Sequence, residues 1–274
     1  MMRLTYLTLF PELIESYFQE GLLSRALKNQ LLEKKTIQLR DFSKNKYKSI
    51  DGKSYGGGDG MVFSPEPVAD AIAEAKKSFL ADKKNKIVLI SPQGKVCNQP
   101  LLSELSDLDH IVFLCGRYAG FDQRITAMCD LEISIGDYVL SGGELPALVV
   151  TEGLMRHRQG FLGNANSVMK DSFAITDRGE AGLLEAPQFT EPRDFLGEKI
   201  PDVLQSGHHQ KIAEWKENMA VLVTLKKRPD LMARYPKEKI PFTIKDFYKK
   251  LNSADKELLG IEDLDSQLKD LFLS

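Results

Sequence analysis

The sequence is organised around one stretch of fourteen residues, Ser134-Ile135-Gly136-Asp137-Tyr138-Val139-Leu140-Ser141-Gly142-Gly143-Glu144-Leu145-Pro146-Ala147. Its first half, as far as Leu140, is rich in β-branched and aromatic residues and predicts a strand. Two glycines follow, where the backbone can turn sharply or a ligand can approach without meeting a Cβ atom. Ser141 and Glu144 have capping-box spacing, which predicts a helix that runs to about Gly160. The stretch is therefore either a ligand cradle or an ordinary strand-to-helix turn.

Two further apolar runs also lead into glycine-containing loops. Residues 87–91 lead into Pro92-Gln93-Gly94, and residues 110–115 lead into the segment 116–124. Continuous apolar runs are typical of strands in a parallel sheet that helices cover on both faces. In open sheets of this class, ligands bind beyond the carboxyl ends of the strands. The sequence therefore predicts an α/β fold with a ligand site formed by three glycine loops.

Other elements follow from local patterns along the chain. We expect strands at 4–10 and 36–39, a helical apolar stripe over 13–23, a helix over 65–79 and a short helix near 103. Residues 43–61 read as a polar, glycine-rich loop. Its Asp51-Gly52-Lys53-Ser54 is not a phosphate-binding P-loop, because Tyr47 stands where that motif needs glycine. Residues 160–169 have the small and polar composition of a linker, and the chain beyond Pro201 reads as mostly helical.

The composition is that of a globular protein. Of 274 residues, 42% are hydrophobic and 28% are charged, which leaves enough apolar side chains for a sizeable core. No apolar run approaches the length of a membrane span, and the N-terminus lacks the apolar region of a signal peptide. No C-x-x-C pair occurs among the three cysteines, so we expect reduced thiols and a cytoplasmic location. The lack of a membrane-length apolar run predicts no membrane partner. No H-E-x-x-H arrangement is present, so no transition-metal site is predicted.

The charge is distributed unevenly, although the net charge is only −2. Residues 28–53 hold eight Lys and Arg against three Asp and Glu, and residues 199–250 hold twelve against six. Residues 251–274 are acidic, with two against six. Basic regions on a nearly neutral chain fit binding to a phosphate backbone at defined patches, and solvated surface is the alternative interpretation.

Two long motifs carry a family resemblance. They are Cys115-Gly116-Arg117-Tyr118 with Gly120 and Asp122-Gln123-Arg124, and the opening stretch from Ser134 to Leu140 with Gly142 to Ala147. Shorter matches lie at Tyr55-Gly56-Gly57-Gly58, Asp171-Ser172-Phe173, Gly182-Leu183-Leu184 and Ser206-Gly207-x-His209. With these motifs the chain resembles the bacterial tRNA (guanine-N1)-methyltransferase family of the SPOUT class. The resemblance covers most of the chain and thins after about Trp215.

The resemblance implies a specific organisation of the chain. Residues 1–160 would form a SPOUT methyltransferase domain, a parallel sheet with helices on both faces and a trefoil knot over about 87–160. Residues 161–171 would be an interdomain linker, and residues 172–274 a small, mostly helical tRNA-binding domain. The family also implies a homodimer whose active sites are shared between subunits.

The implied reaction transfers a methyl group from S-adenosyl-L-methionine to N1 of guanosine 37 in tRNA, next to the anticodon. This nitrogen carries a proton, so a base must accept it and the charge that spreads to O6 must be stabilised. By resemblance, Asp171 is the base and Arg156 the stabilising cation. From the residues alone, Arg156 also suits a helix C-terminus, and Asp171 suits a helix cap or turn.

The remaining site residues are also assigned by resemblance. The donor site would contain Leu89, Ser91, Pro92, Gln93, Gly94, Gly116, Tyr118, Gly120, Ser134, Ile135, Gly136, Asp137, Tyr138, Val139, Leu140, Gly142, Gly143 and Pro146. The tRNA substrate would contact Tyr55, Gly57, Gly58, Ser172, Ser206 and His209.

The chain also departs from the family pattern. The family usually has glutamate where this chain has Ala119, which removes a carboxylate and bears on the magnesium dependence that the family implies. Residues 189–192 read Phe-Thr-Glu-Pro where the family pattern is similar to Tyr-Thr-Arg-Pro, and an insertion includes residues 175–181. Two alternatives stay open at this stage: an RNA-binding protein with a non-catalytic donor pocket, and a nucleoside triphosphatase, against which the incomplete P-loop speaks.

Overall fold

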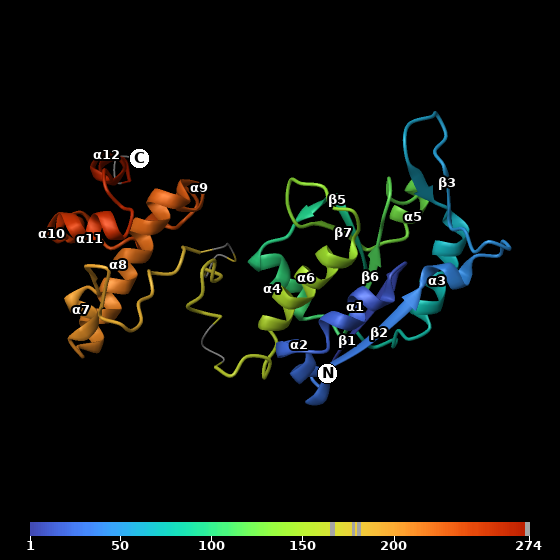
Figure 1. Cartoon of the computed structure of the whole chain (residues 1–274), viewed down its shortest axis with the longest axis horizontal. Helices are drawn as coiled ribbons and strands as arrows, with labels where there is room; N and C mark the ends of the chain where they lie inside the picture. Colours follow the sequence, from blue (N-terminus) through green and yellow to red (C-terminus); the bar gives the residue numbers. More distant parts are fainter. Residues whose placement is uncertain (165–167, 177–178, 180–181, 272–274) are drawn as a thin grey trace. The chain divides into compact units, whose positions relative to one another are not determined.

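The computed structural model describes residues 1–164, 168–176, 179 and 182–271. The chain divides into two compact units, Met1–Ala165 and Asn166–Ser274 (Figure 1). The predicted insertion at residues 175–181 lies mostly outside the described residues, as does part of the predicted linker.

The first unit contains a five-stranded parallel sheet. Across the sheet, the strands are β2 (Leu32–Gln38), β1 (Met2–Thr8), β6 (His110–Cys115), β5 (Asn85–Val96) and β7 (Leu131–Ser134). Apolar side chains on both faces of β1, β5 and β6 are buried, as expected for a sheet covered on both sides. The predicted α/β class with a parallel sheet is therefore confirmed, whereas the trefoil knot stays a prediction.

Helices cover both faces of this sheet (Figure 1). One face carries α1 (Pro11–Tyr17), α2 (Gly21–Lys28), α4 (Gln99–Ser106) and α6 (Glu144–Arg156). The other face carries α3 (Pro65–Lys76), α5 (Gln123–Thr126) and the 3-10 turn η1 (Leu39–Phe42). Period-2 alternation on the strands separates the two cores, because Phe113 packs on the first face and Val112 on the second. The apolar stripe predicted over 13–23 is divided between α1 and α2.

The prediction of a strand up to Leu140 is wrong. The strand β7 ends at Ser134, and residues 135–143 form a loop before α6. The hydroxyl of Ser134 accepts from the Gly136 backbone N–H at 3.2 Å, which turns the chain out of the sheet. The predicted capping box is also absent, because Gly143 is the N-cap of α6 and the Glu144 side chain is directed into the interior. The β-propensity of these residues favours a strand, but the hydrogen bond between the Ser134 hydroxyl and the Gly136 N–H turns the backbone into a loop.

The strand β5 does not end at Ser91 as expected. It continues to Val96, and its pairing with β7 shifts register between Ile90 and Lys95. The four residues in between leave the regular ladder. Gly94 lies just before β5 pairs with β7 again. Glycine is required there, because a Cβ atom would lie 2.4 Å from the backbone carbonyl carbon of Glu132.

The second unit is mostly helical in its described part. Its elements are β8 (Asp194–Phe195), β9 (Glu198–Lys199), α7 (Asp202–Gln205), α8 (His209–Lys227), α9 (Pro229–Met232), the 3-10 turn η2 (Lys237–Lys239), α10 (Ile244–Lys250), α11 (Ser253–Leu258) and α12 (Asp265–Asp270). Its core forms around α8, where Trp215, Met219 and Leu222 are buried together with Ile261 and Leu264 from the C-terminal segment. In the part of the chain that the structure describes, no helix is long and apolar enough to span a bilayer.

Candidate functional site

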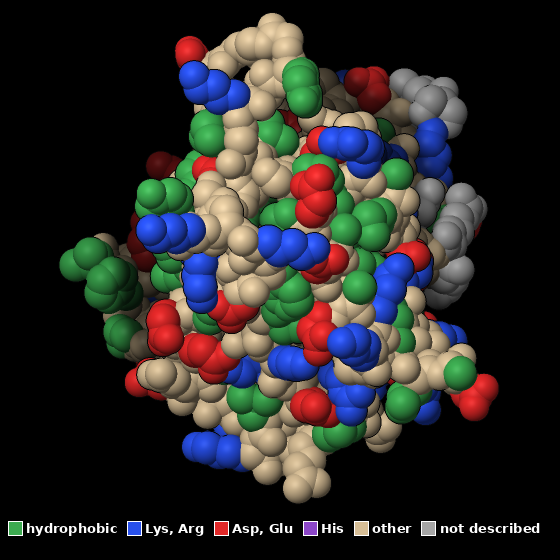
Figure 2. Space-filling view, turned by 90° about the vertical axis from the view of Figure 1, so that its right-hand side faces the viewer, with side chains coloured by type: hydrophobic (Ala, Val, Ile, Leu, Met, Phe, Trp, Pro, Cys, Tyr) green, Lys and Arg blue, Asp and Glu red, His purple; other side chains and the backbone are tan. Residues whose placement is uncertain are grey.

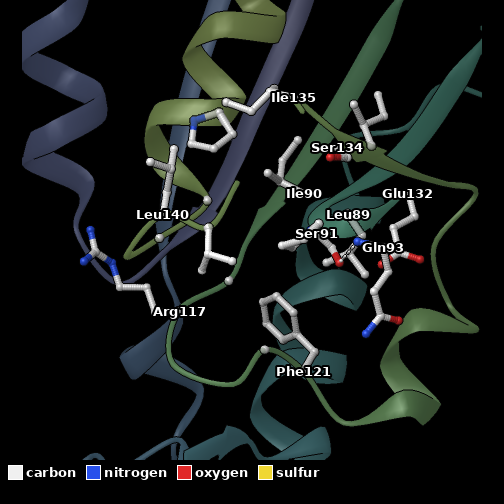
Figure 3. Close-up of a pocket in the computed structure, with 18 of the residues that line it drawn as sticks. Leu89, Ile90, Ser91, Gln93, Arg117, Phe121, Glu132, Ser134, Ile135 and Leu140 are labelled. Atoms are coloured by element: carbon white, nitrogen blue, oxygen red, sulfur yellow. Dashed lines mark hydrogen bonds between the residues drawn. The ribbon is translucent and has the colours of Figure 1, made fainter. Parts of the chain in front are cut away.

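A cavity of about 280 Å³ lies at the carboxyl ends of β6 and β7, beside the middle of β5. Three segments form its walls: residues 89–93 of β5, the loop 116–121 after β6, and the segment 132–143 that includes the end of β7 (Figure 3). This is the position at which open parallel sheets bind ligands. The three glycine loops that the sequence singled out therefore meet at one site.

Most of the residues assigned to the donor site line this cavity. They are Leu89, Ser91, Pro92, Gln93, Gly116, Tyr118, Gly120, Ser134, Ile135, Gly136, Tyr138, Val139, Leu140, Gly142, Gly143 and Pro146. Gly94 and Asp137 are not part of the lining. Gly94 serves the crossing of β5 and β7 described above, and Asp137 is exposed.

Sequence reasoning missed several residues of the lining. They are Phe121, Gln123, Thr126, Glu132 and Ile133, whereas Ile90, Arg117 and Ala119 lie within the segments that the resemblance assigns to the donor site. Gln123 and Thr126 come from α5, which the sequence analysis did not predict. The acidic residue Glu132 lies in β7, away from the glycines, and no motif in the sequence marks it.

The cavity combines apolar and polar walls. Leu89, Ile90, Ile135 and Leu140 supply apolar surface, and Glu132 supplies a carboxylate. Figure 3 shows the Gln93 and Glu132 side chains at the same side of the cavity. The Gln93 backbone N–H donates to the Ser91 hydroxyl at 3.1 Å, which fixes the segment that leaves the β5 ladder. Such a site can hold a flat heterocycle against apolar walls while polar groups fix its orientation.

Close backbone approach joins two of the cavity loops. The Gly143 N–H donates to the Gly116 carbonyl at 2.7 Å, and Arg117 pairs with Gly142 in an isolated bridge. A Cβ atom at Gly143 would lie 2.9 Å from the Gly116 nitrogen, closer than Cβ contacts allow. Glycine at position 143 is thus required by the contact between the loops.

A small hairpin borders the cavity on the side of the 116–121 loop. Its strands are β3 (Asp51–Lys53) and β4 (Met61–Phe63), which interrupt the predicted loop 43–61. The Ala119 N–H donates to the Met61 carbonyl at 3.0 Å, and the Phe63 N–H donates to the Gly120 carbonyl at 2.9 Å. The base of the hairpin is therefore bound to the cavity loop.

The tip of this hairpin carries three of the residues assigned to tRNA contact. Tyr55, Gly57 and Gly58 lie between β3 and β4 and are exposed, with the Tyr55 side chain fully accessible to solvent. The hairpin tip thus offers an aromatic ring and exposed backbone to a partner.

Arg156 is the last residue of α6, whose first turn contributes Pro146 to the cavity. It is half-buried and interacts with other groups of the chain. Burial raises the pKa of Glu152, one helical turn earlier, and the positive charge of Arg156 opposes that rise. Burial and Arg156 both lower the pKa of His157. Burial is the larger influence on both side chains, and the Arg156 charge is the second.

The other assigned residues belong to the second unit. Asp171 is half-buried and its carbonyl accepts from the Ala174 N–H at 3.1 Å. The Ser172 hydroxyl accepts from the Glu185 N–H at 2.9 Å. Ser206 and His209 are exposed around the start of α8. Asp171 and Ser172 thus share a turn that is bound to the segment leading into the helical core.

The first basic region is part of a surface of mixed charge. Figure 2 shows Lys and Arg side chains interspersed with Asp and Glu on one face, without a large area of one sign. Lys44 lies 3.3 Å from Asp70, and Lys48 lies 3.6 Å from Asp41. These are exposed ion pairs, which contribute little to stability and can exchange partners.

The residues described by the structure contain no group of three or more His, Cys, Asp or Glu side chains arranged to hold a metal ion. The magnesium dependence that the family implies stays a prediction for this chain.

Comparisons with known proteins agree with the motifs. A family model described as tRNA (Guanine-1)-methyltransferase TrmD matches residues 2–234. A protein of Staphylococcus carnosus named tRNA (guanine-N(1)-)-methyltransferase is 43% identical over 250 residues, which are 91% of this chain and 98% of that protein. A protein of the same name from Staphylococcus aureus (strain Newman) is 42% identical over 94% of this chain and 96% of its own length. Another from Dictyoglomus turgidum is 42% identical over 85% of this chain and 91% of its own length.

Proposed function

From the premise that the chain belongs to the tRNA (guanine-1)-methyltransferase family, we propose that it transfers a methyl group from S-adenosyl-L-methionine to N1 of guanosine 37 in tRNA. The enzyme class is that of the family, a tRNA (guanine-N1)-methyltransferase. The observation that carries the proposal at residue level is the cavity in which the motif loops meet.

The residues of the cavity fit an adenosine-containing donor. The wall formed by Leu89, Ile135 and Leu140 can cover the faces of a purine. Gly116 and Gly142 are half-buried and line the cavity, where the absence of a Cβ atom lets main-chain groups reach the ribose and the base. The bound donor supplies an activated methyl group on a sulfonium, so the protein mainly positions the reactants and stabilises charge.

The chain must also activate guanine N1. Asp171 accepts the N1 proton in this proposal, and Arg156 donates to O6, where negative charge develops. Support comes from the motif match at Asp171-Ser172-Phe173 and from the place of Arg156 at the end of the helix that begins at the cavity. Tyr55, Gly57 and Gly58 at the hairpin tip, with Ser172, Ser206 and His209, contact the tRNA.

A homodimer with shared active sites is part of the proposal. The helices α1 and α6 are neighbours on one face of the sheet and carry exposed apolar side chains. Leu13 is 48% exposed, Tyr17 45%, Leu145 58% and Val149 47%. An apolar surface of this kind on adjacent helices suits a subunit interface. The second unit then binds tRNA, and we expect the protein to act in the cytoplasm, where its tRNA substrate is found.

The test is methylation of an unmodified tRNA transcript with a methyl-labelled donor, followed by mapping of the modified nucleotide. We expect label on guanosine 37 and none on a matched transcript that has adenosine at that position. Label at another nucleotide would refute the assigned position. Donor binding without any methyl transfer to either transcript would favour an RNA-binding protein with a non-catalytic pocket.

A further inference from the structure

A buried carboxylate lies directly behind the cavity, and the proposed reaction does not use it. Glu144, at the start of α6, is 1% exposed. Its Oε1 accepts from the Thr8 hydroxyl at 2.7 Å, and its Oε2 accepts from Arg117 Nε at 3.1 Å. Arg117 Nη2 lies 3.1 Å from the same oxygen. A carboxylate is held in such a place only where its charge and lone pairs are satisfied.

A fourth residue closes this network. The Arg117 guanidinium lies 4.2 Å from the centre of the Phe10 ring, and the Phe10 N–H donates to the Thr8 hydroxyl at 2.9 Å. Thr8, Phe10, Arg117 and Glu144, here called the Glu144 network, thus connect the end of β1, the start of α6 and the loop after β6. In Figure 3 the Arg117 side chain is directed away from the other labelled side chains, although its residue lines the cavity.

The loop after β6 needs such support. Its next residue, Tyr118, has φ of 58°, a left-handed conformation that is unfavourable for a residue with a side chain. Backbone strain of this kind persists only where the surroundings fix it. The hairpin fixes one end of the loop through the bond from the Ala119 N–H to the Met61 carbonyl. The other end is fixed by Arg117.

We infer that Glu144 is a positioning residue for the donor cavity, acting through Arg117 to hold Gly116 and Tyr118 in the conformation that receives the donor. The inference rests on the proposed donor site. A loop that is already ordered loses less conformational entropy when a ligand binds, so the network increases donor affinity by preorganisation. Loss of one bond in the network should weaken donor binding by about five- to twentyfold.

The strand β1 offers a matched pair of variants. Thr8 and Thr5 are both fully buried, and each hydroxyl bonds to a buried polar side chain. Thr8 bonds to Glu144, whereas Thr5 bonds to Nε2 of His110 at 2.9 Å. Valine has the same shape as threonine, so Thr8→Val and Thr5→Val each lose buried hydrogen bonding with little change in packing. Only Thr8→Val should weaken donor binding.

The experiment is calorimetric titration of the full chain with S-adenosyl-L-methionine, for the parent and both variants. Thermal unfolding and tRNA binding are measured on the same samples. We expect both variants to melt below the parent, the donor Kd to rise only for Thr8→Val, and the tRNA Kd to be unchanged in both. Equal donor Kd values for the parent and Thr8→Val would overturn the inference, because the network would then only stabilise the fold.

A second variant protects the test against misfolding. Arg117→Lys keeps a positive charge near Phe10 but removes the Nε donor to Glu144, at a side chain that is 20% exposed. It should raise the donor Kd within the same range, and parent-like affinity would again overturn the inference. If the parent itself does not bind the donor, the proposed donor site is wrong, and that result is distinct from a failure of the positioning role.

Discussion

Gly143 donates its backbone N–H to the Gly116 carbonyl at 2.7 Å, so the turn before α6 is joined directly to the end of β6. A Cβ atom at Gly143 would lie 2.9 Å from the Gly116 nitrogen and 3.0 Å from the Cys115 Cα. These are backbone atoms at the end of a buried strand, and they cannot move aside as the end of a flexible side chain can. The two loops therefore fit together only with glycine at this position.

Gly143→Ala should consequently open the contact between these loops and weaken donor binding. Steric overlap in a packed site costs about 1–3 kcal/mol, so we expect the donor Kd to rise by about tenfold or more. Calorimetric titration measures it. Gly163→Ala is the control, because a Cβ atom there meets nothing within 4 Å. Similar donor affinity for the two variants would show that the contact does not shape the donor site.

The sequence contains two kinds of structural signal, and only one of them predicted the fold correctly. Continuous apolar runs such as 110–115 predicted strands of the parallel sheet, because burial on both faces leaves a strong pattern. The segment from Ile135 to Leu140 has the composition of a strand but forms a loop, because its β-branched and aromatic residues belong to the cavity wall. The β-propensity of single residues does not show whether a segment pairs in the sheet or forms a loop beside it.

The sequence predicted the position of the cavity but not the buried contacts behind it. Glycines at the ends of strands located the cavity, since close backbone approach leaves a trace in the sequence. Nothing near Glu144 indicated its bond to Thr8, because the two residues are 136 positions apart. The S-x-x-E spacing predicts that Glu144 caps its own helix, whereas in the structure its carboxylate accepts from the distant Thr8 hydroxyl. Asp171 and Arg156 lie in different units, so their pairing rests on the family motif.

The stability of the first unit should depend on His110 as the pH falls. This histidine is 3% exposed and bonds to the Thr5 hydroxyl, and burial lowers its pKa from 6.5 to about 4. The folded state thus holds the neutral ring, whereas the unfolded chain binds a proton below about pH 6.5. The stabilisation is complete above pH 6.5 and is lost as the pH falls towards 4, by up to about 3 kcal/mol.

Urea unfolding at pH 7 and pH 4.5 measures this loss. His110→Gln keeps a hydrogen-bonding side chain but removes the titration, so its free energy of unfolding should change less between the two pH values than that of the parent. An equal change in both proteins would mean that other groups account for the acid sensitivity.

Replacing Lys44, Lys46 and Lys48 by glutamine in one triple variant should weaken tRNA binding. If each lysine neutralises one phosphate, the slope of log K against log salt falls by about 0.7–0.9 for each charge removed. Filter binding at several salt concentrations measures the slope, and donor affinity should not change. A triple variant of Lys77, Lys83 and Lys84 removes the same charge near the amino end of β5, away from the cavity. Equal slopes for the two variants would identify the first basic region as solvated surface.

Mixing two inactive variants should test the shared active site. Gly142→Val disables the donor cavity, because a Cβ atom there would lie 2.5 Å from Glu144 Oε2 and 2.7 Å from Arg117 Nε. Asp171→Ala removes the base. If one subunit supplies the cavity and its partner supplies Asp171, each heterodimer has one intact site, and a random mixture should regain about a quarter of the parent activity. A mixture that stays inactive after verified subunit exchange would place both residues of each site in one subunit.

Asp171→Asn should slow the chemical step while leaving donor binding nearly unchanged. Guanine N1 must lose its proton before it can attack the methyl group, and asparagine keeps the shape of the side chain but cannot accept that proton. General-base catalysis contributes about 10²–10⁴-fold, so we expect a loss in this range in single-turnover experiments with saturating enzyme. Arg156→Ala should reduce the rate comparably, because the charge on O6 would lose its partner. If both side chains act on one transition state, the double variant should lose less than the product of the two factors. A rate for Asp171→Asn within about threefold of the parent, far short of that range, would exclude Asp171 as the base.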